Sequence, residues 1–343
     1  MFKTILLILL GIIIIAVAGF FVFINSVPPL PPEADTIIEG VMQSELQPFV
    51  SGETGIAKNG KVRIWYESFN PPDSAKGAVL LIMGHGATAL LWPDYFYQPI
   101  VDSGYQVIRY DNRGLGMSDW MEDWDESNPY SLKDMAKDGV AILDALDIEK
   151  AHIIGVSMGG MIGQRLAISH SDRILSLTSI MSSGDITDPD LPAVPKEFEL
   201  NFLKLALKYG ISPSETDIIK FSLTVQQMVM GDGGYPLDIE YITARTLYEI
   251  RHRRGYNTTT GDQHTAAVLA SGSSYSELPR INLPALVIHG KSDPLVNIAH
   301  SKKLAAKIYG ATTLWIDGMG HDLPRAYVPQ MLESIFRIFQ KAG

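Results

Sequence analysis

The sequence predicts an α/β fold with a mostly parallel central sheet, helices on both faces of the sheet, and a helical lid insertion. Three observations lead to this prediction. From about residue 54, short apolar runs alternate with segments of helical spacing. The run from Ala78 to Met83 is continuously apolar, as expected of a parallel strand buried on both faces. The alternation stops between Asp185 and Asp262, where the chain is helix-like and rich in aromatic residues and methionine, and strands resume at Leu286.

The other strands and helices follow from local patterns. Lys61 to Glu67 alternates apolar and polar residues, which is typical of an edge or antiparallel strand. Ser131 begins a helix that runs to Leu146, since it lies three residues before Asp134 and can cap the first turn. We expect further strands at 106–110, 152–156, 174–181, 285–289 and 312–316, a helix at 158–168, and a closing helix at 327–341.

These patterns divide the chain into five parts. We expect an N-terminal anchor or signal peptide at 1–26, a Pro-rich and therefore extended linker at 27–53, the two halves of the α/β core at 54–184 and 263–343, and the lid at 185–262. An insertion between strands of such a core commonly covers the pocket. The alternative is a second packing layer with no role in substrate choice.

The charge balance excludes some classes of protein. The chain has 28 Lys and Arg against 38 Asp and Glu, a formal net charge of −10. This argues against nucleic-acid binding, which needs clustered Lys and Arg. The short basic cluster 251–254 is interpreted as a solvated helix face, with a patch for an anionic ligand as the alternative. The chain has no cysteine, which excludes disulfides, thiolate nucleophiles and thiolate zinc sites.

The N-terminus carries a long apolar run. Residues 5–24 match the ~20 residues that a membrane-spanning helix needs. Lys3 precedes this run and no Lys or Arg follows it before Lys58, which favours a single-pass membrane protein with its folded domain on the extracytoplasmic side. The alternative is a secreted protein whose signal peptide is cleaved, since Ala16-Val17-Ala18 offers a small-x-small site.

One motif has the form of a nucleophile elbow. Ser157 stands between Gly155 and Gly159, after a predicted strand and before a predicted helix. Small residues on both sides allow a turn that is too tight for larger side chains. The helix that follows aims its N-terminal N–H groups at the same place. We therefore predict Ser157 as the nucleophile.

A serine hydroxyl needs a base to become nucleophilic, and the chain has eight histidines. His321 lies in a glycine-rich loop after the last predicted strand, which places its imidazole at the carboxyl edge of the sheet. We predict His321 as the general base, with His264 as the runner-up. His289 ends a strand and is expected to be a packed, hydrogen-bonded histidine.

Asp293 fits as the acid that orients the base. It lies on a loop after strand 285–289, between the predicted nucleophile and base in the chain order of this fold. It could also form an Asx-turn or a helix N-cap, since Pro294 follows, and both roles can hold. Asp322 is less suitable, because a sequence neighbour of His321 points away from its ring.

An oxyanion hole needs two N–H donors. The N–H of Met158, directly after the nucleophile, should be one. The other should come from the loop 83–88, whose glycines let the backbone approach a substrate. We expect His85 N–H to be this donor, with Gly86 in reserve. The side chain of His85 either lines the pocket or holds the loop.

Together these residues resemble the α/β-hydrolase superfamily. Four separated motifs agree over roughly residues 60–340: the loop 83–88, the run 111–118, the elbow around Ser157, and the Asp293/His321 pair. The segments Leu81-Ile82-Met83-Gly84, Leu91-Trp92-Pro93-Asp94 and 318–324 are similar to the branch that contains aclacinomycin methylesterase-like enzymes. Many relatives have His-Gly where this chain has Met83-Gly84, a departure that concerns the oxyanion loop and not the triad.

The resemblance implies an ester substrate, contacted by Gly86 and Trp92. A serine nucleophile argues against the branch of haloalkane dehalogenases, which use aspartate. We expect acyl transfer in two steps, in which His321 takes the proton of Ser157 and water later hydrolyses the acyl-enzyme. No metal or organic cofactor is implied. The expected partner is a small apolar ester, since the lid is rich in aromatic residues and methionine.

Three alternatives stay open. The same triad could serve a cofactor-free perhydrolase or haloperoxidase, or a hydrolase of carbon–carbon bonds. A catalytically silent binding module would usually lack triad residues, whereas all three positions are filled here. An adhesion protein would use the anchor as its main functional part.

Overall fold

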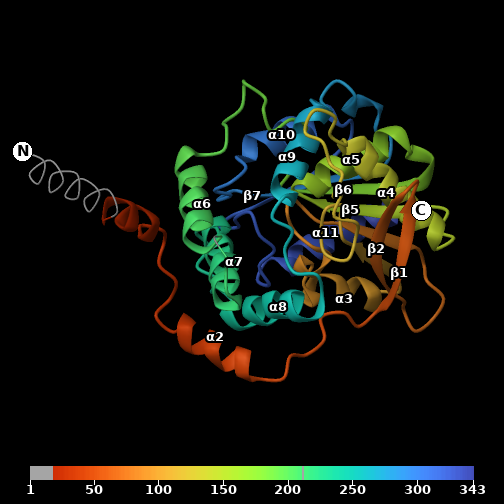
Figure 1. Ribbon diagram of the computed structural model, residues 1–343. Helices are drawn as coiled ribbons and strands as arrows, with labels where there is room; N and C mark the ends of the chain where they lie inside the picture. The colour runs from red at the N-terminus through yellow and green to blue at the C-terminus, as the bar shows by residue number, and fades with distance from the viewer. Residues whose placement is uncertain (1–17, 211) are drawn as a thin grey trace, which may run out of the picture. The chain divides into compact units, whose positions relative to one another are not determined.

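The computed structural model of the 343-residue chain describes residues 18–210 and 212–343 (Figure 1). These residues form two compact units. The sheet unit contains residues 47–193, 229–236 and 248–343. The helical unit contains, among the described residues, 18–46, 194–228 without 211, and 237–247.

The sheet unit holds an eight-stranded sheet of order β1-β2-β4-β3-β5-β6-β7-β8. β1 pairs antiparallel with β2 and β2 antiparallel with β4, whereas all other neighbours are parallel. The predicted mostly parallel sheet is therefore confirmed. The strands are β1 (Glu53–Asn59), β2 (Val62–Phe69), β3 (Ala78–Ile82), β4 (Gln106–Tyr110), β5 (Ala151–Val156), β6 (Ile174–Ile180), β7 (Ala285–Gly290) and β8 (Thr312–Ile316).

Strand β1 was not predicted from the sequence. Only Ala57 of this strand is buried, and the other positions are exposed or half-buried. An edge strand with so little apolar surface shows no alternation that a pattern could detect. It forms because its backbone pairs with β2 over its full length.

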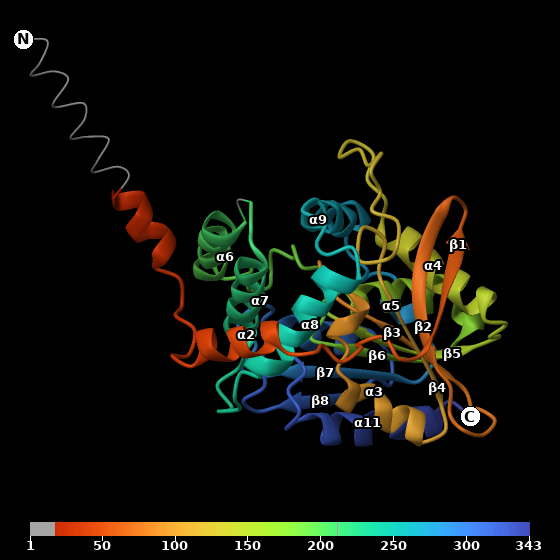
Figure 2. The same ribbon diagram turned by 60° about the horizontal axis from the view of Figure 1, so that its bottom comes forward.

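Helices cover both faces of the sheet, as predicted. Successive side chains of β3 point to opposite faces of the sheet. Leu80 and Ile82 lie in one apolar cluster, and Val79 and Leu81 lie in the other. The first cluster includes residues of α4 (Leu132–Ala145), α5 (Met158–Ser169) and α10 (Ile298–Lys307), and the second includes residues of α3 (Asp94–Asp102) and α11 (Val328–Lys341). Figure 2 shows α3 and α11 together on one side of the strands, opposite α4 and α5.

The predicted start of α4 is confirmed in detail. Ser131 Oγ accepts a hydrogen bond from the N–H of Asp134 at 3.3 Å, and the Asp134 carboxylate accepts one from the N–H of Ser131 at 3.0 Å. This reciprocal capping box satisfies two N–H groups that the first helical turn leaves without partners. Short 3-10 turns lie at Ala89–Leu91, Ser171–Arg173 and Leu278–Arg280.

The helical unit contains α2 (Ala34–Gln43), α6 (Lys196–Tyr209), α7 (Glu215–Val229) up to Met228, and the first part of α8 (Ile239–His252). Here the structure differs from the predicted extended linker at 27–53, because residues 34–43 are helical. Ala34 and Ile38 are buried in a cluster with Ile219 and Leu223 of α7, and this burial stabilises a helix directly after a Pro-rich stretch. The insertion 185–262 is helical as predicted, while its role as a lid stays a prediction.

The prediction of a membrane anchor over residues 5–24 needs correction. Residues 5–17, and with them most of the signal-peptide alternative, lie outside the described residues. Among the described residues of this run, 18–24 are helical. Within residues 18–210 and 212–343, no helix has both the length and the apolar character to cross a membrane. The single-pass localisation is therefore wrong for the part of the chain that the structure describes.

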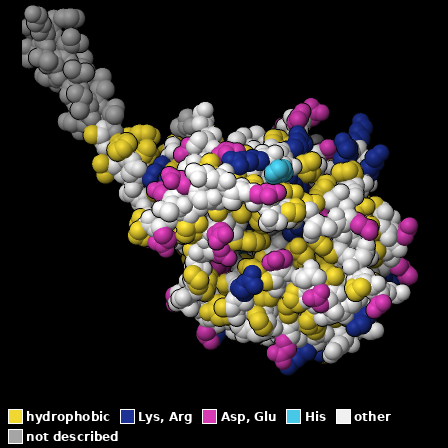
Figure 3. All heavy atoms as spheres, turned by 90° about the horizontal axis from the view of Figure 1, so that it is seen from below, with side chains coloured by type: hydrophobic (Ala, Val, Ile, Leu, Met, Phe, Trp, Pro, Cys, Tyr) yellow, Lys and Arg dark blue, Asp and Glu magenta, His cyan; other side chains and the backbone are white. Residues whose placement is uncertain are grey.

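The charged side chains are dispersed on the face shown in Figure 3. Lys and Arg lie scattered among Asp and Glu and do not gather into one patch. This face therefore offers no concentrated positive surface to a phosphate backbone.

Candidate active site

Ser157 occupies the whole turn between β5 and α5. Its backbone angles are φ 54° and ψ −120°, which a residue with a side chain rarely adopts. Its N–H donates to Ile180 O at 2.9 Å, and its carbonyl accepts from Ser182 Oγ at 2.7 Å. The strained turn is therefore tied to β6 and to the loop that follows it.

The glycines around Ser157 are required by packing. A Cβ on Gly155 would lie 2.2 Å from Gly159 O, and one on Gly159 would lie 2.0 Å from Ile82 O. Both neighbours are backbone atoms, which cannot move aside as a flexible side chain can. A Cβ on Gly84 would lie 3.2 Å from the Cβ of Ser157, so the loop after β3 passes directly beside the candidate nucleophile.

Asp293 and His321 form a hydrogen-bonded pair. His321 Nδ1 lies 2.7 Å from Asp293 Oδ2, and the two side chains are 8% and 0% exposed. The other carboxylate oxygen accepts hydrogen bonds from the N–H groups of Leu295 and Val296 at 2.9 and 2.8 Å. Asp293 thus closes an Asx-turn with one oxygen and contacts the imidazole with the other.

His289 contacts the carboxylate of Asp293 in this pair. Its Nε2 lies 3.2 Å from Asp293 Oδ2 and 2.8 Å from Val296 O, and its Nδ1 lies 2.6 Å from Ser301 Oγ. It is a buried, hydrogen-bonded histidine. Burial by itself would raise the pKa of Asp293, but the nearby His321 and the hydrogen bonds from His289 and His321 outweigh it and hold the pKa below its ordinary value.

The sheet topology brings the three residues to one edge. Ser157 follows β5, Asp293 follows β7 and His321 follows β8, and these strands are parallel. Their carboxyl ends therefore meet at the same edge, where open α/β sheets bind ligands. The structure joins His321 to Asp293. Among the residues it describes, no hydrogen bond joins His321 to the Ser157 hydroxyl, and such contacts are often longer in a free site.

Helix α9 (Thr260–Ser271) holds the loop beside the nucleophile. Gly86 N–H donates to His264 Nδ1 at 3.1 Å, so this N–H is already engaged. His85 Nε2 lies 3.0 Å from both Gly261 O and Thr265 Oγ1. The side chain of His85 therefore holds the loop, and its backbone N–H rather than that of Gly86 remains the proposed oxyanion donor.

His264 is a structural support for this loop, a role that was not predicted from the sequence. Its Nε2 lies 2.9 Å from Arg113 O, so it donates there while Nδ1 accepts from Gly86. Burial, with a smaller effect of His85, lowers the pKa of His264 to about 3. The ring therefore stays neutral with both nitrogens engaged. A single sequence places His264 near the end of the insertion but gives no sign of its two partners.

We expect His264→Ala to lower kcat for ester hydrolysis by less than the ~100- to 1000-fold that loss of an oxyanion donor costs. Ser157 should still react with a fluorophosphonate, because only the loop loses a support. His321→Ala should lose about six orders of magnitude, since loss of the base from a triad costs about as much as loss of the nucleophile. His170→Ala, at the end of α5, is the matched control. Loss of labelling in the His264 variant with retention in the His321 variant would reverse the two roles.

Trp92 and Arg253 lie elsewhere than expected, whereas Arg251, His252 and Arg254 of the basic cluster are exposed. Trp92 is 0% exposed and packs against Phe96 with ring centroids 5.0 Å apart, within the core on the α3 side. Arg253 is not part of a solvated face, because its side chain is 3% exposed and paired with the buried Asp111. Asp111 also accepts from Ala89 N–H at 2.9 Å, which supports its interpretation as structural.

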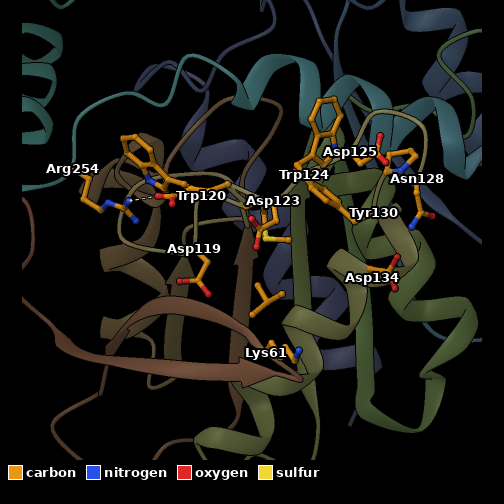
Figure 4. A pocket seen from close by; sticks show the side chains of 14 residues that line it. Lys61, Asp119, Trp120, Asp123, Trp124, Asp125, Asn128, Tyr130, Asp134 and Arg254 are labelled. Carbon is orange, nitrogen blue, oxygen red and sulfur yellow. Dashed lines mark ion pairs between the residues drawn. The ribbon is translucent and has the colours of Figure 1, made fainter.

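A separate hollow of about 720 Å³ lies between the β1–β2 turn and the loop 119–130 (Figure 4). Asp119 accepts a hydrogen bond from Arg63 N–H at 2.8 Å, and Arg254 lies 4.2 Å from the centre of the Trp120 ring, so several of its polar groups already have partners. No member of the Asp293–His321 pair lines it, and neither does Ser157. We therefore place the candidate active site at the carboxyl edge of the sheet.

The sheet order and the strand–serine–helix turn define the class of protein. The chain belongs to the α/β-hydrolase fold family, whose model matches residues 77–324. It is a hydrolase enzyme of this fold, and the predicted family resemblance is confirmed.

The relatives of the chain include a methylesterase and a second hydrolase. The rhodomycin D methylesterase of Streptomyces peucetius is 32% identical over 288 residues, which cover 80% of this chain and 93% of that protein. The 2-hydroxy-6-oxononadienedioate/2-hydroxy-6-oxononatrienedioate hydrolase of Comamonas testosteroni is 30% identical over 264 residues, covering 73% and 83%. The solved meta-cleavage product hydrolase from Pseudomonas fluorescens has a TM-score of 0.63 at 22% identity, covers 86% of this chain and 100% of that chain, and shares the fold.

Proposed function

We propose that the protein is a carboxylic ester hydrolase that uses Ser157, His321 and Asp293 as a triad and forms an acyl-enzyme. The observation that carries the proposal is the 2.7 Å hydrogen bond between His321 Nδ1 and Asp293 Oδ2 at the sheet edge that also carries the strained serine. A proton held on Nδ1 leaves Nε2 as the basic nitrogen, and this nitrogen can take the proton of a serine hydroxyl.

The proposed steps use the groups around Ser157. His321 removes the hydroxyl proton as Ser157 Oγ attacks the ester carbonyl, and the N–H groups of Met158 and His85 stabilise the oxyanion. His321 then protonates the leaving alcohol. Water, activated by the same imidazole, hydrolyses the acyl-enzyme and frees the carboxylic acid.

The proposed substrate is a small apolar ester, and methyl esters are the first to test. The rhodomycin D methylesterase supports this choice, because its similarity to this chain covers most of both proteins. A second candidate reaction, hydrolysis of a carbon–carbon bond next to a ketone, is favoured by the 30% identical relative from Comamonas testosteroni. Both reactions would use the same triad.

A covalent probe tests the triad. The full-length chain is treated with a fluorophosphonate, and the modified peptide is located by mass spectrometry, with His321→Ala as the matched variant. We expect the label on Ser157 of the native chain and at most a trace in the variant. A native chain that stays unlabelled, or labels equally without His321, would contradict the proposed triad.

A substrate comparison separates the two candidate reactions. Turnover of methyl and p-nitrophenyl esters is measured beside turnover of a 2-hydroxy-6-oxo-dienoate. We expect kcat/KM for the esters to be the higher. The opposite order would assign the same site to carbon–carbon bond hydrolysis.

A further inference from the structure

Two glycine-rich segments lie backbone against backbone next to the candidate base. One is residues 318–320, in the loop that carries His321. The other is Val229–Pro236, called here the strap, which belongs to the sheet unit. A Cβ on Gly231 would lie 2.3 Å from Gly318 O, and one on Gly320 would lie 2.2 Å from Gly231 N. Only glycines allow the two backbones to approach so closely.

Hydrogen bonds join the strap to the loop on both sides of this contact. His321 N–H donates to Val229 O at 2.7 Å, and Gly233 N–H donates to Gly318 O at 2.9 Å. A glycine-rich loop loses much conformational freedom when it becomes ordered, so its geometry depends on partners outside it. The strap supplies two such partners through its own backbone.

Tyr235 adds side-chain contacts to the strap. Its hydroxyl donates to Asp322 Oδ1 at 2.8 Å and accepts from Gly231 N–H at 2.8 Å and Gly320 N–H at 3.4 Å. A phenolic hydroxyl has one proton to donate and lone pairs to accept, and here both are used. Burial, together with the Asp322 charge, raises the pKa of Tyr235, so its hydroxyl remains a donor.

Asp322 follows the candidate base directly, and its carboxyl group is turned to Tyr235. Burial raises the pKa of Asp322 to about 6, while the hydrogen bond from Tyr235 and the nearby His321 act in the opposite direction. The Tyr235 hydroxyl therefore contacts a buried carboxyl group that lies directly after the base. The residue after the base therefore acts as an attachment point for the strap.

We propose that Tyr235 is a positioning residue for His321: its hydroxyl joins the strap to Gly320 and Asp322, which flank His321, and so sets where the imidazole stands. This inference rests on the proposed function, because it assigns the means by which the proposed base is held. Tyr235 itself takes no part in proton transfer. Its effect on the rate passes through the backbone of the base loop.

Two variants test the proposal through the rate of serine modification. Tyr235→Phe keeps the ring and removes the hydroxyl, and Tyr309→Phe, at a side chain that is 92% exposed, is the matched control. We expect Tyr235→Phe to slow fluorophosphonate labelling of Ser157 and lower kcat by about 10- to 100-fold with KM nearly unchanged, since small displacements of a catalytic group cost this much. The control should match the native chain. Native rates in Tyr235→Phe would overturn the proposal.

A double-mutant cycle and an exchange measurement complete the test. Asp322→Ala should cause a similar loss that Tyr235→Phe does not increase, whereas Asp322→Asn, which keeps an acceptor for the hydroxyl, should lie closer to the native rate. Additive losses would contradict a shared hydrogen bond. Amide hydrogen exchange at His321 should accelerate in Tyr235→Phe and stay unchanged in Tyr309→Phe. The exchange measurement does not depend on activity. A native chain that fails to label would refute the triad but would leave the positioning role of Tyr235 testable by exchange. Unchanged exchange at His321 in Tyr235→Phe would refute that positioning role.

Discussion

Replacing Ser157 by alanine is expected to lower kcat for ester hydrolysis by about six orders of magnitude, since removal of a serine nucleophile from an intact triad has an effect of this size. The variant loses only the Oγ atom, which attacks the carbonyl in the proposed mechanism. The strain in the backbone is unchanged, because alanine at φ 54° has about the same steric cost as serine. The measurement is kcat for p-nitrophenyl acetate beside the melting temperature. A variant that folds normally and keeps most of the activity would exclude Ser157 as the nucleophile.

Ser157→Gly separates the chemistry from the strain. Glycine adopts positive φ without the steric cost, so this variant should be as inactive as the alanine variant and about 1 kcal/mol more stable than it. Thermal or denaturant unfolding of the two variants measures the difference. Equal stabilities would indicate that the turn is not strained.

The second large effect is expected for Asp293→Asn, at about four orders of magnitude in kcat. Asp293 Oδ1 accepts two backbone N–H groups, so an asparagine would place its oxygen there and turn its NH₂ group to His321. An NH₂ donor facing Nδ1 favours the tautomer with the proton on Nε2. The imidazole then has no free lone pair for the serine proton.

The same variant tests the ionisation of Asp293. The pKa of Asp293 is lower in the folded chain than the ~3.9 of an unfolded aspartate, so its charge stabilises the folded state above about pH 4. This contribution fades as the pH falls through the folded-state pKa. The difference in unfolding free energy between the native chain and Asp293→Asn should therefore shrink below pH 4. A difference that stays constant from pH 7 to pH 3 would contradict the lowered pKa.

Much of the fold was accessible from local patterns. Strands 106–110 and 312–316 were predicted at their observed bounds, because the residues of each short strand and of the turns beside it mark where it begins and ends. The same holds for Ser131 at the start of α4 and for the glycines around Ser157. The contact of Asp293 with His321 could be anticipated from chain order, since parallel strands place their carboxyl ends at one edge.

The misses share a different cause. β1 has a weak local pattern and forms because β2 pairs with it, whereas α2, which follows a Pro-rich stretch, is stabilised by burial against α7. The apolar run at the N-terminus has a strong pattern, yet the described helices include none that could span a membrane. A run of apolar residues indicates that a segment is suited to an apolar environment, but it does not show what the segment contacts.

The residues of the candidate site divide along the same line. Ser157, Asp293 and His321 were predicted from sequence, because each stands in a turn that its own glycine, proline or neighbouring strand marks. The contacts of His264 and Tyr235 were not predicted, since each residue forms a hydrogen bond with a loop more than 80 residues away along the chain, at Gly86 and Asp322. Local residues set the conformation of a turn through steric limits on its backbone. Which distant side chain holds that turn depends on how the whole sheet unit packs, and only the tertiary structure decides it.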